Sequence, residues 1–231
     1  MSQLSQRNID ILKIIVEEYL TTGELIGSKA LLKKYNLGVS PATVRNDMAR
    51  LETLKLIYQP YNSAGRLPTS KGIRAFVNYL MQQYPDYFLG EERKYVKENY
   101  KELTDYIHQI VFELGNMTGE IAFCIIPEKS ILEYIGIAHF ISQNYKRLGD
   151  DILNIIKMLE NKRNFTDFIA QFPISEGVNV FIGEENIIPF LKDYTIILKS
   201  VLINGEVGYI GIIGGMKMNY SFNISAVRGI I

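Results

Sequence analysis

Apolar residues recur at spacings of three and four along residues 1–81, the period that places them on one face of a helix. The pattern predicts helices at 6–20, 28–35, 41–55 and 70–81. Ser5 and Ser28 are expected to cap the first two, because a serine hydroxyl accepts a hydrogen bond from the unpaired N–H groups of a first turn. Ser40 followed by Pro41 predicts the start of the third, where the missing N–H of proline has no cost.

The predicted helix over 41–55 has an outer side unlike that of most solvated helices. Its inward stripe is apolar and consists of Val44, Met48, Leu51 and Leu54. The opposite side carries Ala42, Asn46, Ala49 and Thr53, with Arg45 and Arg50 at its edges. Small residues let a nucleic-acid backbone approach closely, while asparagine can bridge an adenine edge, arginine a guanine edge, and an alanine methyl can touch a thymine methyl.

A short hairpin is predicted after this helix. Residues 56–59 have strand character, and 66–69 can return as an edge strand in which Pro68 is tolerated. Residues 60–65 form a turn-rich tip. Three helices and a hairpin in this order are typical of a winged helix-turn-helix, whose wing contacts phosphate or the adjoining minor groove. The alternative is a hairpin that only closes the core.

Charge is divided unevenly along the chain, although the formal net charge is zero. Residues 1–80 hold eleven Lys or Arg and six Asp or Glu, whereas residues 81–231 hold fourteen and nineteen. A basic first part and an acidic second part suggest that the first part meets a polyanion. Ordinary surface patchiness would give similar counts, so charge alone does not decide between the two interpretations.

Composition indicates a globular protein of the cytoplasm. Apolar residues make up 47% of the chain, enough for a real core. The first residues lack the basic start and apolar block of a secretory signal, and no apolar run is long enough to span a bilayer. A single cysteine, Cys124, excludes an intrachain disulfide and favours a reducing compartment. We expect no membrane association.

The second part of the chain predicts an α+β body over 91–231, after a linker at 82–90 that contains Pro85 and several aromatic residues. Helical segments are expected at 91–117 and 150–172, and strands at 121–126, 131–136, 178–182, 195–203 and 206–214. Asn204-Gly205 between the last two strands is a strong type I′ hairpin signal. We expect a mixed sheet with flanking helices.

Candidate chemistry in this body is weak, so we expect neither an enzyme nor a cofactor or metal site. His108 and His139 lack further ligands at metal-binding spacing. Glu184-Glu185 is better explained by the first turn of a short helix than by paired catalytic carboxylates. The glycines between 208 and 215 lie in a predicted strand and lack the Lys-Ser/Thr of a phosphate loop, and Cys124 in its apolar run is expected to be buried and inert.

The sequence resembles the HrcA family of heat-inducible transcription repressors. Residues 16–77 resemble the family's N-terminal domain, and the motifs that carry this resemblance are Thr22-Gly23-Glu24, Gly27-Ser28-Lys29, the segment from Ser40 to Met48, and the segment from Ser63 to Thr69. The run VFIGEEN at 180–186 resembles a family signature, as does the closing GYIGIIGGMKMNYSFNISAVRGI. Gly215 and Lys217 stand where the family has proline and arginine.

This resemblance implies a dimeric repressor that binds an inverted-repeat operator called CIRCE upstream of chaperone and chaperonin genes. It also implies a GAF-like body and assistance by a GroEL-type chaperonin. The segment between the strands at 121–126 and 131–136 is short, whereas family members carry an inserted dimerising segment and further strands before the Gly-Glu-Glu-Asn strand. The chain therefore resembles a shortened member, which puts dimerisation through the insert in doubt.

The leading hypothesis is a winged helix-turn-helix over 1–81 that binds double-stranded DNA as a homodimer. Bases are expected to be read by Arg45, Asn46, Ala42 and Ala49. Phosphates are expected to be held by Thr43, Arg50, Lys29 and Arg66. The predicted interface is completed by Ser28, Ser40, Ser63 and Gly65. The alternatives are a small-molecule sensor or enzyme with a GAF-like body, whose winged helix binds proteins, and a degenerate member that depends on a partner for its fold.

Overall fold

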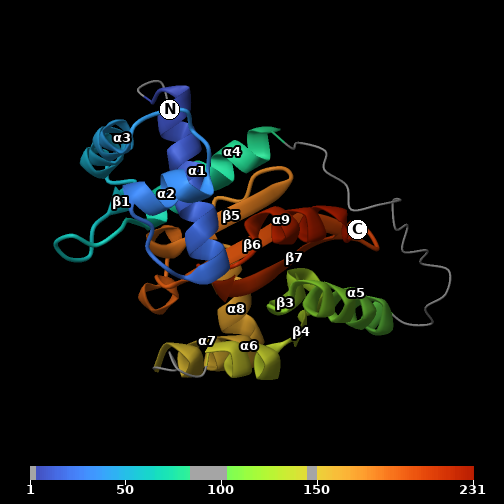
Figure 1. Ribbon diagram of the computed structural model, residues 1–231. Coiled ribbons are helices and arrows are strands. Elements are labelled where there is room, and N and C mark those ends of the chain that lie inside the picture. Colours follow the sequence, from blue (N-terminus) through green and yellow to red (C-terminus); the bar gives the residue numbers. More distant parts are fainter. Residues whose placement is uncertain (1–3, 84–102, 145–149) are drawn as a thin grey trace. The chain divides into compact units, whose positions relative to one another are not determined.

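The computed structural model describes residues 4–83, 103–144 and 150–231. Contacts within the chain divide it into two compact units, Met1–Pro85 and Asp86–Ile231, which are described separately here (Figure 1). The elements of the first unit are α1 (Gln6–Thr22), α2 (Ser28–Lys34), α3 (Pro41–Thr53), β1 (Ile57–Tyr58), β2 (Leu67–Pro68) and α4 (Ser70–Gln83).

The starts of α1 and α3 follow local capping chemistry. Ser5 caps α1, since its hydroxyl accepts from the N–H of Asn8 at 3.2 Å while the Asn8 Oδ1 accepts from the Ser5 N–H at 3.2 Å. Ser40 caps α3 by accepting from the Thr43 N–H at 3.1 Å. Both predictions are confirmed. The predicted cap at Ser28 is wrong: Gly27, with extended backbone, is the N-cap, and Ser28 is the first helical residue.

The core of the first unit is formed mostly by the faces that the periodicity predicts, with Ile11 and Ile14 of α1 added to it. Its fully buried side chains come from every helix and from β1; they include Ile11, Ile15, Leu31, Val44, Leu51, Ile57, Ile73 and Val77. Leu54, expected on the inward stripe of the third helix, follows the last helical residue and is half-buried. Burying these apolar faces together stabilises helices that would be marginal in isolation.

The hairpin is shorter than expected but is tied to a second segment of the chain. β1 and β2 pair antiparallel, with Ile57 opposite Pro68. Arg66 just before β2 also pairs with Ile26, donating its N–H to the Ile26 carbonyl at 2.9 Å and accepting in return at 3.3 Å. A Cβ at Gly65 would lie 2.6 Å from the Ile26 carbonyl carbon, so only glycine allows this close approach.

The second unit is built on one sheet of five strands in the order β4-β3-β7-β6-β5. The strands are β3 (Ile121–Ile126), β4 (Ile131–Ile135), β5 (Val178–Ile182), β6 (Tyr194–Ile203) and β7 (Glu206–Gly215). All four pairings are antiparallel, so the expected mixed sheet is wrong. The connections explain this: the 3₁₀ turn η2 (Pro127–Lys129) returns β3 into β4, and Asn204-Gly205, both with positive φ, returns β6 into β7.

Helices cover both faces of this sheet. They are α5 (Leu103–Thr118), α6 (Ile137–Asn144), α7 (Asp150–Glu160), α8 (Lys162–Ile169) and α9 (Tyr220–Gly229). Helices α6, α7 and α8 share a buried hydrophobic cluster with alternate residues of β3, in which the rings of Phe165 and Phe123 meet edge to face with their centroids 5.0 Å apart. Helices α5 and α9 contact each other and pack on the other face of the sheet, to which the alternate strand residues such as Ala122 point.

The remaining predicted elements agree less closely with the structure. The predicted linker at 82–90 overlaps the end of α4 at residues 82 and 83, and its remainder lies outside the described residues, as does the first part of the predicted helix 91–117. The helical segment predicted at 150–172 is two helices, because Asn161 interrupts it and caps α8. Helix α6 was not predicted. The domain boundaries at 81 and 91 stay predictions.

Candidate nucleic-acid interface

The outer side of α3 faces solvent as the periodicity predicts. The exposed residues of the helix are Pro41, Ala42, Arg45, Asn46, Ala49, Arg50 and Thr53. The buried residues are Val44, Asp47, Met48 and Leu51. The exposed side therefore presents small and polar groups between two arginines, and these are residue types that can contact base edges in a major groove.

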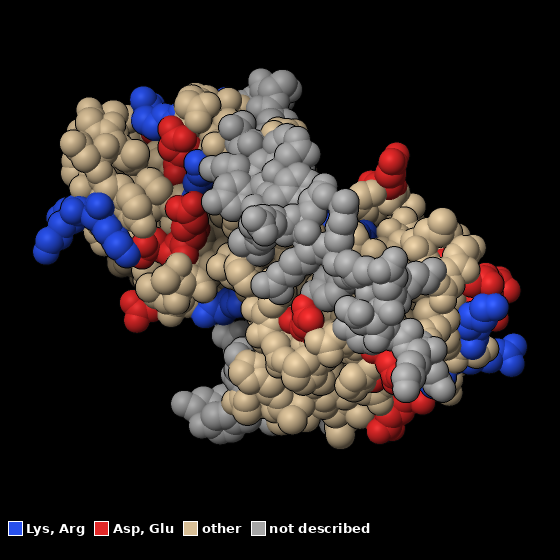
Figure 2. All heavy atoms as spheres, turned by 90° about the vertical axis from the view of Figure 1, so that its right-hand side faces the viewer, with Lys and Arg blue, Asp and Glu red and all other residues tan. Residues whose placement is uncertain are grey.

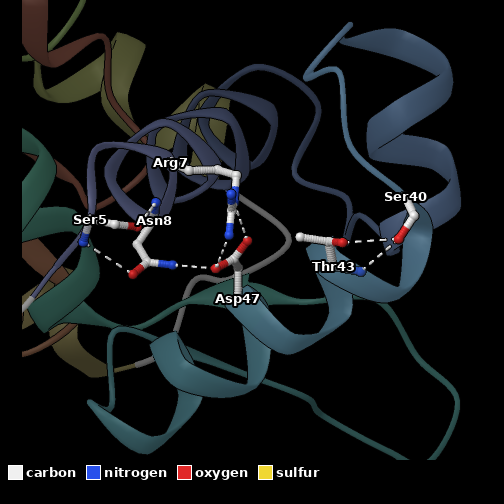
Figure 3. A network of polar contacts seen from close by, with 6 residues as sticks. All are labelled: Ser5, Arg7, Asn8, Ser40, Thr43 and Asp47. Carbon is white, nitrogen blue, oxygen red and sulfur yellow. Dashed lines mark hydrogen bonds and ion pairs between the residues drawn. The ribbon is translucent and has the colours of Figure 1, made fainter.

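The first turn of α3 is held by its own hydroxyl groups. The Ser40 Oγ accepts from the Thr43 N–H and lies 2.9 Å from the Thr43 Oγ1 (Figure 3). Ser40 is exposed and Thr43 is half-buried. Both predicted DNA-contacting hydroxyls thus already stabilise the helix start, and any hydrogen bond to a phosphate oxygen would use the one hydroxyl proton that the bond between them leaves over.

Asp47 anchors α3 to the beginning of α1, a contact that sequence reasoning missed. Arg7 Nε donates to Asp47 Oδ2 at 2.7 Å, and Asn8 Nδ2 donates to Asp47 Oδ1 at 2.7 Å (Figure 3). The hydrogen bond that Arg7 donates to Asp47 raises the pKa of Arg7 above its ordinary value. The signal was available: Asp47 lies between Val44 and Met48 on the inward stripe, where a carboxylate requires a partner.

Glu52, the other carboxylate of α3, pairs with Arg66 of the hairpin. Arg66 Nη2 donates to Glu52 Oε2 at 3.1 Å, and Nε lies 3.1 Å from Oε1 without the angle of a hydrogen bond. Arg66 Nη1 donates to the Ala64 carbonyl at 3.1 Å, which fixes the loop. Only 15% of the Arg66 side chain is exposed.

These contacts do not support the expected phosphate contact of Arg66. Its charge is compensated by Glu52 and its guanidinium is directed at its own protein. Gly65 is also buried, against Ile26, and therefore serves the packing of the hairpin. Ser63 is exposed at the tip of the hairpin, with a φ of 64° in the left-handed region.

Helix α2 is connected to α1 through Glu18. Glu18 Oε1 accepts from Lys34 Nζ and from the Tyr35 hydroxyl, both at 2.6 Å. These hydrogen bonds lower the pKa of Glu18, and they raise the pKa of Tyr35 to about 12. Lys29, on the same helix, is exposed, and Ser28 is half-buried. Lys29 is therefore presented to solvent as expected, whereas Ser28 is only partly accessible.

The acidic and basic residues of α3 thus differ in their surroundings. Both of its carboxylates contact an arginine from another element, Arg7 of α1 or Arg66 of the hairpin. Its two arginines, Arg45 and Arg50, lie on the exposed side. On the face drawn in Figure 2, basic and acidic side chains form small separate groups between uncharged residues. The sorting of charges on α3 is therefore the specific signal for a binding surface on this helix.

The titratable residues that the structure describes in the second unit form no comparable cluster. Within the described ranges, no group of three His, Cys, Asp or Glu side chains could hold a metal ion. His108 lies on the surface of α5, where Nδ1 is 2.7 Å from Glu133 Oε1. Cys124 is buried as predicted, and burial raises the pKa of its thiol to about 12.

The two remaining motifs of the second unit have structural explanations. Glu184-Glu185 belongs to the 3₁₀ helix η4 (Gly183–Glu185), where Glu185 Oε2 accepts from the Ile182 N–H at 2.8 Å. The glycines between 208 and 215 lie in β7, and a Cβ at Gly211 would collide with the Ile197 carbonyl oxygen of β6. Both preferred interpretations of these motifs are confirmed.

Among the described helices of both units, none has the length and apolar character that a membrane span needs.

The fold and the site define a protein with a small helical unit, whose third helix presents two arginines to solvent, followed by an α/β unit on an antiparallel sheet. The family described as "HrcA protein C terminal domain" matches residues 66–224, more than half of the 231 residues. The chain belongs to the HrcA family.

Curated relatives carry the name "Heat-inducible transcription repressor HrcA". The relative from Moorella thermoacetica is 37% identical over 131 residues, which cover 55% of this chain and 38% of that protein. The relative from Streptomyces avermitilis is 43% identical over 127 residues, covering 54% and 37%. The relative from Alkaliphilus metalliredigens is 51% identical over 80 residues, covering 35% and 23%. The chain therefore matches less than half the length of each of these relatives.

A solved structure has the same fold. It is described as "Crystal structure of a hypothetical protein at 2.2 A resolution", and its TM-score with this chain is 0.79 at 18% identity. The superposition covers 98% of this chain and 96% of that chain.

Proposed function

We propose that the first unit is a winged helix-turn-helix that binds double-stranded DNA, with α3 in the major groove. The observation that carries the proposal is the sorting of side chains on α3. Its outer side is exposed and carries Arg45 and Arg50, while Asp47 and Glu52 are held by arginines of other elements. No carboxylate of this helix would then repel the phosphates that flank a groove.

Base reading is assigned to the exposed centre of α3. Asn46 would bridge an adenine edge and Arg45 a guanine edge, with Ala42 and Ala49 against thymine methyl groups. Phosphate contacts are assigned to Arg50, to Lys29 and to Thr43. Ser28, Ser40 and Ser63 lie at the periphery of this surface, and Arg66 and Gly65 position the hairpin.

The function proposed for the whole chain is repression of heat-shock genes. The curated relatives are named heat-inducible transcription repressors, and family membership extends the proposal to this chain. We assign it an inverted-repeat operator of the CIRCE type, bound by a homodimer in the cytoplasm at the nucleoid, since two-fold protein symmetry matches a two-fold site. The second unit is assigned a GAF-like regulatory and dimerising role, with a GroEL-type chaperonin as a further partner.

Fluorescence anisotropy with two duplexes tests the proposal. One duplex carries the CIRCE inverted repeat and the other the same bases in scrambled order, and both are titrated at several salt concentrations. The wild-type chain is expected to prefer the CIRCE duplex, with an affinity that falls steeply with salt. Binding to neither duplex at low salt would refute DNA binding, and equal binding to both would refute sequence-specific repression.

Asn46→Ala tests the base-reading assignment. It should reduce the preference for the CIRCE duplex by about 1–3 kcal/mol, the value of a good bidentate base contact. Asn78→Ala is the matched control, because Asn78 is an exposed asparagine on α4 and should leave the preference unchanged. If Asn46→Ala keeps the wild-type ratio of affinities, the assignment of Asn46 is wrong.

A further inference from the structure

The hairpin between α3 and α4 offers no uncompensated positive charge. Between Ile57 and Pro68 the sequence contains one charged residue, Arg66. Its guanidinium is paired with Glu52 and hydrogen-bonded to the Ala64 carbonyl. A wing of this kind cannot act as a cationic finger on the phosphate backbone, so any contact it makes with DNA must come from uncharged groups.

The group that this hairpin exposes most is an aromatic ring. Tyr61 at its tip is 66% exposed, more than any other large apolar side chain of the described part of the first unit. Tyr58 of β1 is 45% exposed, and Asn62 and Ser63 beside Tyr61 are exposed as well. Burial in the core therefore does not explain a tyrosine at position 61. In Figure 1 this loop extends away from the helices of its own unit.

The loop that carries Tyr61 is braced by hydrogen bonds. The Ala64 N–H donates to the Tyr61 carbonyl at 3.1 Å, which closes a turn over Asn62 and Ser63. The Ala64 carbonyl accepts from Gln59 Nε2 at 3.0 Å and from Arg66 Nη1 at 3.1 Å. A braced loop loses little conformational entropy on binding, so a contact made by its tip keeps most of its interaction energy.

We propose that Tyr61 is a further DNA-contacting residue, an inference that rests on the proposed DNA-binding function. Its ring packs against a deoxyribose of the backbone beside the groove that α3 occupies, and its hydroxyl donates a hydrogen bond to a phosphate oxygen. A hydrogen bond to a charged acceptor is stronger than a neutral one, and a tyrosine has few rotatable bonds to immobilise. The contact carries no charge, so it releases no counterions and does not depend on salt in the way an arginine contact does.

The test is a salt series of anisotropy titrations with the CIRCE and scrambled duplexes, for wild type, Tyr61→Ala and Tyr61→Arg. Tyr61→Ala should weaken binding to both duplexes about 10-fold, since backbone contacts carry no sequence information. Its slope of log affinity against log salt should equal that of wild type. Tyr61→Arg should steepen the slope by about 0.9, the effect of one added phosphate contact, a gain that misfolding cannot produce.

Leu202→Ala is the matched control, because Leu202 is a 70% exposed apolar residue of the second unit and should leave both affinities unchanged. The inference is overturned if Tyr61→Ala binds both duplexes within twofold of wild type, or if Tyr61→Arg leaves the slope unchanged. Either result would leave the function of α3 intact. Wild-type binding to neither duplex would instead refute the proposed function, and this inference with it.

Discussion

Arg7 Nε donates to Asp47 Oδ2 at 2.7 Å, a contact between residues forty positions apart that ties the start of α1 to the middle of α3. Asn8, which is fully buried, donates to the other oxygen of the same carboxylate and accepts from the Ser5 N–H. The cap of α1 and the position of α3 are therefore set by one network. Asp47, on the inward side of α3, therefore helps to fix the direction in which the exposed side of this helix faces.

Replacing Asp47 by alanine should destabilise the first unit. It leaves the buried Asn8 amide without an acceptor, and an unsatisfied buried donor costs about 1–3 kcal/mol. Hydrogen exchange of the α1 and α3 amides in the full chain measures the loss without requiring the two units to unfold together. Glu17→Ala, at an exposed position of α1, is the control and should change little. Equal protection in both variants would mean that the network does not hold the helices.

Glu120 should make the second unit less stable as pH rises. Burial raises its pKa to about 7 from an ordinary value of 4.5, so the folded chain binds a proton that the unfolded chain has lost. The contribution of Glu120 to the free energy of unfolding is therefore fully present below pH 4.5. It is lost as pH rises through about 7, and the loss is roughly 3 kcal/mol. Glu120→Gln should remove this dependence and raise the urea midpoint at pH 8. An unchanged pH profile of the variant would contradict the assignment.

Gly211→Ala should disturb the centre of the sheet. A Cβ at this position collides with the carbonyl oxygen of Ile197 and with Leu198 of the neighbouring strand, and overpacking of this kind costs about 1–3 kcal/mol. Gly229→Ala at the end of α9 is the matched control, because its Cβ would meet nothing within 4 Å. Thermal unfolding followed by circular dichroism should show a lower midpoint for Gly211→Ala alone. Equal midpoints would show that the strands can separate to accept the methyl group.

The sequence predicted what depends on local periodicity and turn chemistry. The outer side of α3 follows from a 100° period, and the turn at Asn204-Gly205 follows from two residues that tolerate positive φ. Contacts between residues far apart in the sequence were not predicted. The pairing of Glu52 with Arg66 joins α3 to the hairpin, so Arg66 taken alone suggested a phosphate contact. The antiparallel direction of all the sheet pairings was not predicted for the same reason, because strand direction depends on how the connections lead the chain from one strand to the next.

The pair Glu52 and Arg66 allows a test in which two roles of Arg66 give opposite results. If Arg66 positions the hairpin, Glu52→Ala and Arg66→Ala should each weaken binding to the CIRCE duplex, and the double variant should be no weaker than the worse single one, because both remove the same contact. If Arg66 instead holds a phosphate, Glu52→Ala should free its charge and tighten binding, with a steeper dependence on salt. Anisotropy titrations of the three variants at two salt concentrations separate the alternatives. We expect the first result, because the Arg66 guanidinium is largely buried against Glu52 and the Ala64 carbonyl.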